Sequence, residues 1–389
     1  MVLRICFILL LFAVAPAFVI YINRIQFVKS RFLRTVFLLP NVILIVLAAF
    51  FGTTDEAIYK YATAITLFLI AFILICIPEF FYALTLCLTN LFAHTRRGRH
   101  RGNVIGYTLE VLSICIILYG MLTCFVPPKV RVHTFFSPDL PRTFDGYKIV
   151  HVTDLHLGTF KLFPPALNNV VKVINNQKGD LIAFTGDLVN FDSEEIAPYR
   201  DALKAMKAKD GVVSVLGNHD YLMYTRYAGD KGNQRHIDAL KAEERNAGWK
   251  LLCNENIIVH RGNDSIAIAG TENDAKKKPY PMRGDLRKAL SGAEGCRFKV
   301  LLTHDPSHWK DKVIPKTDIQ LTLAGHTHAG QVKIFGRSVA ELSYNEWNGM
   351  YYHGANRAIL VSSGIGEAML PFRLGVRPAI DVIILKCNK

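Results

Sequence analysis

The chain has 389 residues, of which 51% are hydrophobic, and a formal net charge of +14. This length allows two domains, and the eight cysteines lack the C-x-x-C spacing of zinc knuckles or a regular disulfide framework. No basic stripe is interleaved with aromatic residues, so nucleic acid is not an expected partner. We interpret the positive charge as membrane topology plus a mildly basic surface, with attraction to an anionic lipid or substrate as the alternative.

Residues 1–126 form the first predicted domain and consist largely of apolar runs. A bilayer core about 30 Å thick needs about 20 apolar residues in a helix. We therefore expect a bundle of about four transmembrane helices. The third stretch is longer than one span needs and contains Pro78 and Glu79. The four stretches cover residues 3–22, 32–51, 62–90 and 104–126.

Positive charges predict the orientation of these helices. Arginine and lysine gather between Arg24 and Arg34 and again between Arg96 and Arg101, whereas the loop between these clusters has only Lys60. Because loops rich in Lys and Arg stay in the cytoplasm, we expect a multi-pass protein of the inner (plasma) membrane with an extracytoplasmic soluble domain. The alternative treats residues 1–17 as a cleaved signal peptide, which leaves three spans and a cytoplasmic soluble domain.

The rest of the chain divides into a linker and a soluble domain. Residues 127–144 contain four prolines and are predicted to be an extended linker. Residues 145–389 follow as the second domain. Its first part alternates β-branched runs with amphipathic segments, such as a helix over 164–177, and its end is rich in short strands. This order predicts an α/β sandwich of mixed sheets with helices outside.

A polar cluster follows each of five predicted strands. Open α/β sheets place their sites at the carboxyl ends of strands, and the glycines in these clusters permit tight turns, so the polar side chains are expected to converge. The strands cover 147–153, 180–185, 212–216, 298–303 and 319–324. The clusters are Asp154-Leu-His156, Gly186-Asp187-Leu-Val-Asn190, Gly217-Asn218-His219-Asp220, Thr303-His304-Asp305 and Gly325-His326-Thr-His328.

The residue types in these clusters indicate a two-metal site. Asp and His together suit Mn²⁺, Fe²⁺ or Zn²⁺ better than Mg²⁺, which prefers oxygen ligands. Two such ions about 3.5–4 Å apart clamp the attacking and leaving oxygens of a phosphoryl displacement and lower the pKa of a shared water. The sequence therefore predicts hydrolysis of a phosphoester, phosphodiester or pyrophosphate by metal-bound hydroxide.

In order and spacing, the five clusters resemble the calcineurin-like metallophosphoesterases. The whole chain is similar to the bacterial branch with N-terminal transmembrane helices. The resemblance implies a four-layer sandwich over residues 145–389, in which two mixed β-sheets are flanked by helices. It also implies a set of metal ligands. These are Asp154, His156 and His328 for the first metal, Asp187 as a bridge, and Asn218, His304 and His326 for the second.

The same resemblance implies two catalytic residues that are not ligands. His219 would stabilise the phosphoryl charge or protonate the leaving oxygen. Asp220 would hold the His219 ring in position, with a purely structural role in its loop as the alternative. Asn190 is expected to be a turn residue or to support a ligand, rather than to bind metal itself.

Other polar residues near the clusters are interpreted as structural. His151 lies inside a predicted strand, and His308 follows Pro306, which argues against a helical ligand pair with His304. Arg373 and Arg377 are expected on a solvated surface, with a phosphate contact as the alternative. The three lysines at 276–278 are expected in a solvated loop, where facing an anionic bilayer is the alternative.

The sequence thus predicts a membrane-anchored phosphoesterase with two divalent ions, Mn, Fe or Zn. Its expected partners are the lipid bilayer and a phosphate-containing substrate, lipid-linked or from the cell envelope. The alternatives are a cytoplasm-facing pyrophosphatase of the UDP-2,3-diacylglucosamine type, a non-catalytic membrane sensor or scaffold, and a nuclease.

Overall fold

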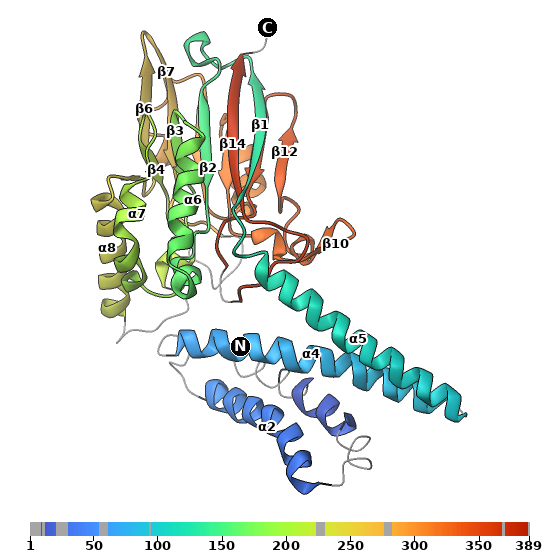
Figure 1. Cartoon of the computed structure of the whole chain (residues 1–389). Helices are drawn as coiled ribbons and strands as arrows, with labels where there is room; N and C mark the ends of the chain where they lie inside the picture. The colour runs from blue at the N-terminus through green and yellow to red at the C-terminus, as the bar shows by residue number, and fades with distance from the viewer. Residues whose placement is uncertain are drawn as a thin grey trace. The chain divides into compact units, whose positions relative to one another are not determined.

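A computed structural model describes most of the chain, which divides into two compact units, Met1–Leu122 and Thr123–Lys389 (Figure 1). The lysines at 276–278 and the acidic and basic residues at 55, 56 and 60 lie outside the described residues, as does part of the expected first span. The described residues are 9, 12–20, 30–53, 61–92, 95–222, 230–275, 282–367 and 370–387.

The first unit is helical. Its long described helices are α2 (Arg31–Thr53), α4 (Ala62–Phe92) and α5 (Arg96–Leu122). Within the described residues, α4 and α5 are long and apolar enough to cross a membrane, and α2 holds a shorter apolar helix, Leu38–Thr53. The helices α4 and α5 approach closely at Gly106, where a Cβ atom would lie 2.8 Å from the Tyr82 ring. Small residues at such positions let helix backbones meet.

The second unit contains two six-stranded mixed sheets. The first sheet has the order β1 (Lys129–Ser137), β14 (Ala379–Cys387), β2 (Lys148–Val152), β3 (Leu181–Phe184), β4 (Val212–Ser214) and β5 (Lys250–Leu251). The second has the order β12 (Gly349–His353), β13 (Arg357–Val361), β9 (Leu321–Ala324), β8 (Lys299–Leu302), β7 (Asp264–Gly270) and β6 (Glu255–Arg261).

Helices cover the outer faces of both sheets, which gives four layers and confirms the predicted fold. The main covering helices are α6 (Pro165–Asn176), α7 (Arg200–Lys204) and α8 (Asp230–Asn246) on the first sheet (Figure 1). The amphipathic segment expected over 164–177 is α6. Its Leu167, Val170, Val171 and Ile174 are buried against the sheet because they share one helix face. The helical segment Trp309–Lys316 packs on the second sheet.

The central core lies between the two sheets. Residues of β3 such as Leu181 and Ala183 pack there against residues of the second sheet such as Val300 and Leu321. The parallel strands β2, β3 and β4 are buried on both faces, because helices cover one face and the other sheet covers the second. This explains their nearly continuous Val, Ile, Leu and Phe runs.

Half of the segment expected to be a linker, residues 127–144, is a strand of the first sheet. β1 pairs in parallel with β14 from Lys129↔Ala379 to Ser137↔Cys387. The Arg131 guanidinium forms two 2.7 Å hydrogen bonds to the Asp381 carboxylate on β14. The four prolines precede and follow β1 without interrupting it, so its ladder hydrogen bonds are intact.

Candidate metal centre

The five polar clusters follow β2, β3 and β4 of the first sheet and β8 and β9 of the second. These strands run parallel to their neighbours within each sheet. Their carboxyl ends therefore open on one edge of each sheet, where ligands can converge. Within the described residues, three groups of His and Asp bring their side-chain atoms within 4.8 Å of one another there.

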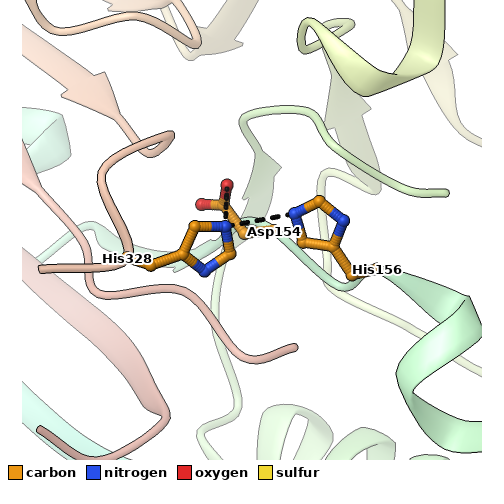
Figure 2. A group of neighbouring side chains, drawn as sticks. All are labelled: Asp154, His156 and His328. Carbon is orange, nitrogen blue, oxygen red and sulfur yellow. Dashed lines mark hydrogen bonds and ion pairs between the residues drawn. The ribbon is translucent and has the colours of Figure 1, made fainter. Parts of the chain in front are cut away.

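One group joins Asp154, His156 and His328 (Figure 2). The Nε2 atoms of His156 and His328 lie 3.1 Å apart. The His328 Nε2 atom is 3.5 Å from Asp154 Oδ1. All three residues are buried. The Asp154 and His156 side chains come from the turn after β2, whereas His328 comes from the turn after β9.

Asn218 lies beside His304 and His326 of another of these groups, and the three residues form a second set of possible ligands. The Asn218 Oδ1 atom is 3.1 Å from His304 Nε2 and 2.7 Å from His326 Nδ1. The two ring nitrogens are 3.3 Å apart. Asp187 reaches both groups with one oxygen: its Oδ2 lies 3.1 Å from His304 Nε2 and 3.6 Å from His156 Nε2.

These donor atoms fit divalent ions. Ligand atoms that bind one ion at bond lengths of about 2.0–2.2 Å lie about 3 Å apart, which matches the separations within each group. The His304 Nδ1–H group donates to the Thr185 carbonyl oxygen at 2.8 Å. This bond orients the ring and directs Nε2 towards the centre, as the outer hydrogen bond of a metal-binding histidine does.

The electrostatics of the first group also favour a cation. Burial and the neighbouring His219 hold the pKa of His156 well below its usual range, and burial and His156 do the same for His328. Both rings are therefore neutral near pH 7, which is the form that binds metal. Burial raises the pKa of Asp154 to about 7, and a divalent ion would oppose that rise by stabilising the carboxylate.

Asp187 and His304 form the charged pair of the centre. Burial raises the pKa of Asp187, but the His304 charge outweighs burial and holds this pKa well below its usual range. Burial lowers the pKa of His304, but the Asp187 carboxylate reverses this effect and raises the pKa to about 10. An ion would have to displace a proton from His304, so its binding is expected to weaken as the pH falls.

The backbone at the centre is strained. Positive φ angles, which are uncommon outside glycine, occur at five of the seven predicted ligands: Asp154, His156, Asp187, His326 and His328. Such clustering is typical of functional sites, where surrounding structure holds the strained turns. Glycine is needed beside two of the ligands. A Cβ atom on Gly217 would lie 2.2 Å from Asp187 Oδ1, and one on Gly325 would lie 2.4 Å from Asp154 Oδ2.

The His219 ring is held by Asn190 rather than by Asp220. Its Nδ1–H group donates to the Asn190 carbonyl oxygen at 2.7 Å. The Asp220 carboxylate instead accepts backbone N–H groups of residues 187, 188, 189 and 217. The expectation that Asp220 positions the His219 ring is therefore wrong, because its oxygens are bonded to the turns that carry Asp187 and Asn218.

Two residues near the centre lie outside the five sequence clusters and were not predicted from them. The Tyr344 hydroxyl lies 2.7 Å from His326 Nε2. Glu195 accepts backbone N–H groups of Gly158, Asn190 and Phe191 at 3.2, 2.7 and 2.9 Å. In the sequence, Glu195 reads only as part of a helix start. Both side chains contact residues of the centre or of its turns, and these contacts form only when the chain folds.

The remaining polar residues have structural contacts. His151 Nε2 is 2.9 Å from the Thr185 hydroxyl in the core, and His308 is buried between Thr303 and Asp274. Arg373 is fully buried and donates to Glu367 at 2.8 Å. A solvated surface and a phosphate contact are therefore both wrong for Arg373, because its guanidinium is enclosed by its own loop. Arg377 is exposed and donates to a carbonyl oxygen.

Comparison with known proteins agrees with this geometry. The model of the calcineurin-like phosphoesterase family matches residues 147–330. The chain is 28% identical over 282 residues to a "Transmembrane protein with metallophosphoesterase domain" of Danio rerio, with 71% of this chain and 61% of the relative covered. It is 31% identical over 280 residues to the metallophosphoesterase YkuE of Bacillus subtilis, with 69% of this chain and 90% of the relative covered.

The length of the match differs between relatives. The chain spans 61% of the Danio rerio protein and 61% of a Bos taurus protein of the same description. Among solved structures, a phosphopantetheinyl hydrolase from Mycobacterium tuberculosis aligns with 57% of this chain and 91% of its own, with 14% identity and a TM-score of 0.38. The family model and the match along nearly all of YkuE establish that the chain belongs to the calcineurin-like metallophosphoesterases.

Proposed function

We propose that this protein is a membrane-anchored phosphoesterase that uses two divalent ions, Mn, Fe or Zn, to hydrolyse a phosphoester, phosphodiester or pyrophosphate bond. The observation that carries the proposal is the convergence of seven side chains from five strand ends on two groups, both of which Asp187 reaches. Ions bound there would supply a nucleophilic water of lowered pKa and would neutralise charge on the phosphoryl group.

Three residues would hold each ion, and Asp187 would contact both. Asp154, His156 and His328 would form the first site. Asn218, His304 and His326 would form the second. Because the ligands of each site come from strand ends of both sheets, the packing of the two sheets fixes the separation of the sites.

His219 would move a proton at the leaving oxygen. The Nδ1–H group donates to the Asn190 carbonyl oxygen, which fixes the ring, and we assign to Nε2 the exchange of a proton or the donation of a hydrogen bond to the phosphoryl group. The His219 and His156 rings meet edge to face at 4.7 Å between centroids, which puts His219 beside the first site.

The membrane part supports an amphiphilic substrate. The helices α4 and α5 are long and apolar enough to span a bilayer, and relatives are described as transmembrane proteins. We propose a lipid-linked or cell-envelope phosphate as the substrate and an extracytoplasmic catalytic unit, in accord with the clusters of basic residues at 24–34 and 96–101. A protease added to intact cells should then remove a tag at the C-terminus. Full protection of the tag would contradict this orientation.

Hydrolysis tests the activity directly. The full-length protein, supplied with Mn²⁺, should hydrolyse generic phosphomonoesters or phosphodiesters. Asp187→Asn and His219→Ala should each reduce kcat at least about 100-fold, because they remove a shared ligand and a proton-transfer group. His260→Gln, at an exposed position on β6, is the matched control. Activity that survives both site changes would refute the assignment.

A further inference from the structure

An exposed apolar segment begins in the chain five residues after His328. The strands β10 (Lys333–Ile334) and β11 (Arg337–Ser338) form a two-stranded hairpin, and one helical turn, Val339–Leu342, follows it. The hairpin stands out from the rest of the catalytic unit (Figure 1). Four apolar side chains of this segment, which we call the hairpin patch, face solvent. They are Ile334, Phe335, Val339 and Leu342, which are 51%, 100%, 61% and 88% exposed.

The tip of the hairpin is unfavourable for its residue type. Phe335 and Gly336 have φ angles of 50° and 83°, the signs that a two-residue type I′ turn requires. Asn, Asp or Gly is favoured at the first of these positions, and a bulky residue with positive φ is strained. Folding alone would therefore favour Asn at 335. A fully exposed Phe at this position indicates a contact with something outside the catalytic unit.

The hairpin patch has a fixed position relative to the metal centre. The Ser338 hydroxyl donates to the Ala329 carbonyl oxygen at 2.7 Å, one residue beyond His328. Tyr344, two residues beyond the patch, has its hydroxyl 2.7 Å from His326 Nε2. These contacts connect both ends of the segment to the turn that carries two of the predicted ligands. A surface that binds the patch is therefore held next to the centre.

We propose that the hairpin patch inserts into the surface of a phospholipid bilayer. The catalytic unit begins at Thr123, directly after α5, so the chain itself tethers this unit to a helix of membrane-spanning length. Exposed apolar side chains next to cations are typical of interfacial membrane contacts. Here Arg337 flanks the tip with its side chain 84% exposed, although it also pairs with Glu341.

Charge favours the same partner. The two strands of the hairpin themselves carry the cations Lys333 and Arg337, which favour contact with phospholipid headgroups. The Lys333 ammonium lies 5.6 Å from the centre of the Trp347 ring, so an aromatic group and a cation stand together beside the patch. Such groups are enriched at the level of lipid headgroups. Insertion of the patch would hold the metal centre at headgroup depth, and this does not depend on which bond the centre hydrolyses.

Fluorescence quenching tests the insertion. The full-length protein is reconstituted in vesicles of equal parts phosphatidylcholine and phosphatidylglycerol with brominated acyl chains, and the emission of wild type is subtracted. The emission that remains after subtraction belongs to the introduced tryptophan. In a Phe335→Trp variant it should be at least about half lower in brominated than in unbrominated vesicles, because the indole enters the acyl region. Phe136→Trp, at a 55% exposed position near the end of β1, is the matched control and should show no loss.

A second variant separates insertion from simple proximity. The Leu342→Trp single variant should be quenched by the brominated lipid. Adding Phe335→Asn should reduce this quenching because the apolar tip is removed, while the hairpin itself is preserved because Asn suits the turn. Tryptophan at 335 that emits as in water and is not quenched would overturn the proposal. A blue-shifted emission without bromine quenching would also overturn it, because protein, such as a second copy of the chain, would then cover the patch.

Discussion

Asp220 determines the shape of the centre through the backbone. Its two carboxylate oxygens accept four N–H groups from the turns after β3 and β4, at 2.8, 2.8, 3.3 and 2.8 Å. Asp187 and Asn218 lie on these turns. A single side chain thus links two strand ends, and its effect on the predicted ligands is indirect.

Asp220→Asn should destabilise the fold by about 3 kcal/mol, because an amide nitrogen cannot accept and leaves buried N–H groups unpaired. The thermal midpoint of the detergent-solubilised protein measures this loss. Asp201→Asn, at an exposed position on α7, should change stability by less than about 0.5 kcal/mol. An Asp220→Asn variant that is inactive yet as stable as wild type would instead give Asp220 a direct chemical role.

Glu244 gives the stability a pH dependence. It is fully buried, and the Ser214 hydroxyl donates to it. Burial, followed by the Asp220 charge, raises the pKa of Glu244 from 4.5 to about 8. Because the folded-state pKa is the higher one, the folded state binds the proton more tightly. The contribution is complete below about pH 4.5 and is lost as the pH rises to about 8, at up to about 1.4 kcal/mol per pH unit.

The thermal midpoint of wild type should fall as the pH rises from 5 to 8. Glu244→Gln should flatten this decline, since the amide is neutral throughout. Glu243→Gln is the matched control at the adjacent position. Hydrogen bonding to Arg200 lowers the pKa of Glu243, so its replacement should leave the decline in place. Equal pH profiles for Glu244→Gln and wild type would contradict a titrating Glu244.

At the scale of elements, the C-terminal loop before β14 is closed by one buried ion pair. Arg373 donates to Glu367 at 2.8 Å and to the carbonyl oxygens of Ser363 and Gly366 at 3.0 and 2.8 Å. The Glu367 backbone in turn exchanges hydrogen bonds with the Thr159 hydroxyl. The loop thereby rests against the turn that follows His156.

Arg373→Met should destabilise the fold by about 3–5 kcal/mol, because Glu367 is left as a buried unpaired charge. The double variant with Glu367→Gln should recover part of this loss, which tests the pair rather than the volume of the side chain. The thermal midpoint measures both. Arg377→Met, at an exposed position in the same loop, should be close to neutral; a loss equal to that of Arg373→Met would contradict this account.

At the scale of the whole molecule, ion binding should stabilise the catalytic unit. The ligands come from strand ends of both sheets, so an ion bound by them joins the two sheets in the folded state only. A chelator should lower the thermal midpoint, and Mn²⁺, Fe²⁺ or Zn²⁺ should restore it. At 100 times the dissociation constant, the gain is about 2.7 kcal/mol per site.

Asp187→Asn should reduce this response, because it removes the ligand shared by both groups. Asp201→Asn should respond as wild type does. A midpoint that is insensitive to chelation in wild type would contradict metal binding and would favour a non-catalytic sensor or scaffold.

The family and the composition of the centre are predictable from the sequence because their determinants are local. Each ligand follows directly after an apolar run, and parallel strands bring such positions to a common sheet edge. The sequence also shows the glycines at 217 and 325, and in the structure Asp187 and Asp154 occupy the space that a Cβ atom at these positions would need. Local order in the chain was therefore sufficient to predict which residues converge.

Contacts between distant segments could not be predicted in this way. The partner of β1 lies 250 residues away on β14, so nothing near β1 in the sequence indicates a sheet. The four nearby prolines therefore led to the prediction of a linker. The acceptor of the His219 ring is a backbone carbonyl, which no side-chain motif records. Arg373 is buried because the loop folds around it.

The sequence by itself determined the fold class, the family and the set of residues at the centre, because turn, ligand and strand patterns are encoded within short segments. Only the tertiary structure decided the conformations and contacts that make the set a centre. These include five predicted ligands with positive φ, one Asp187 oxygen between two groups, and an exposed Phe335 at a strained tip. Such features arise where packing between distant segments outweighs local preference.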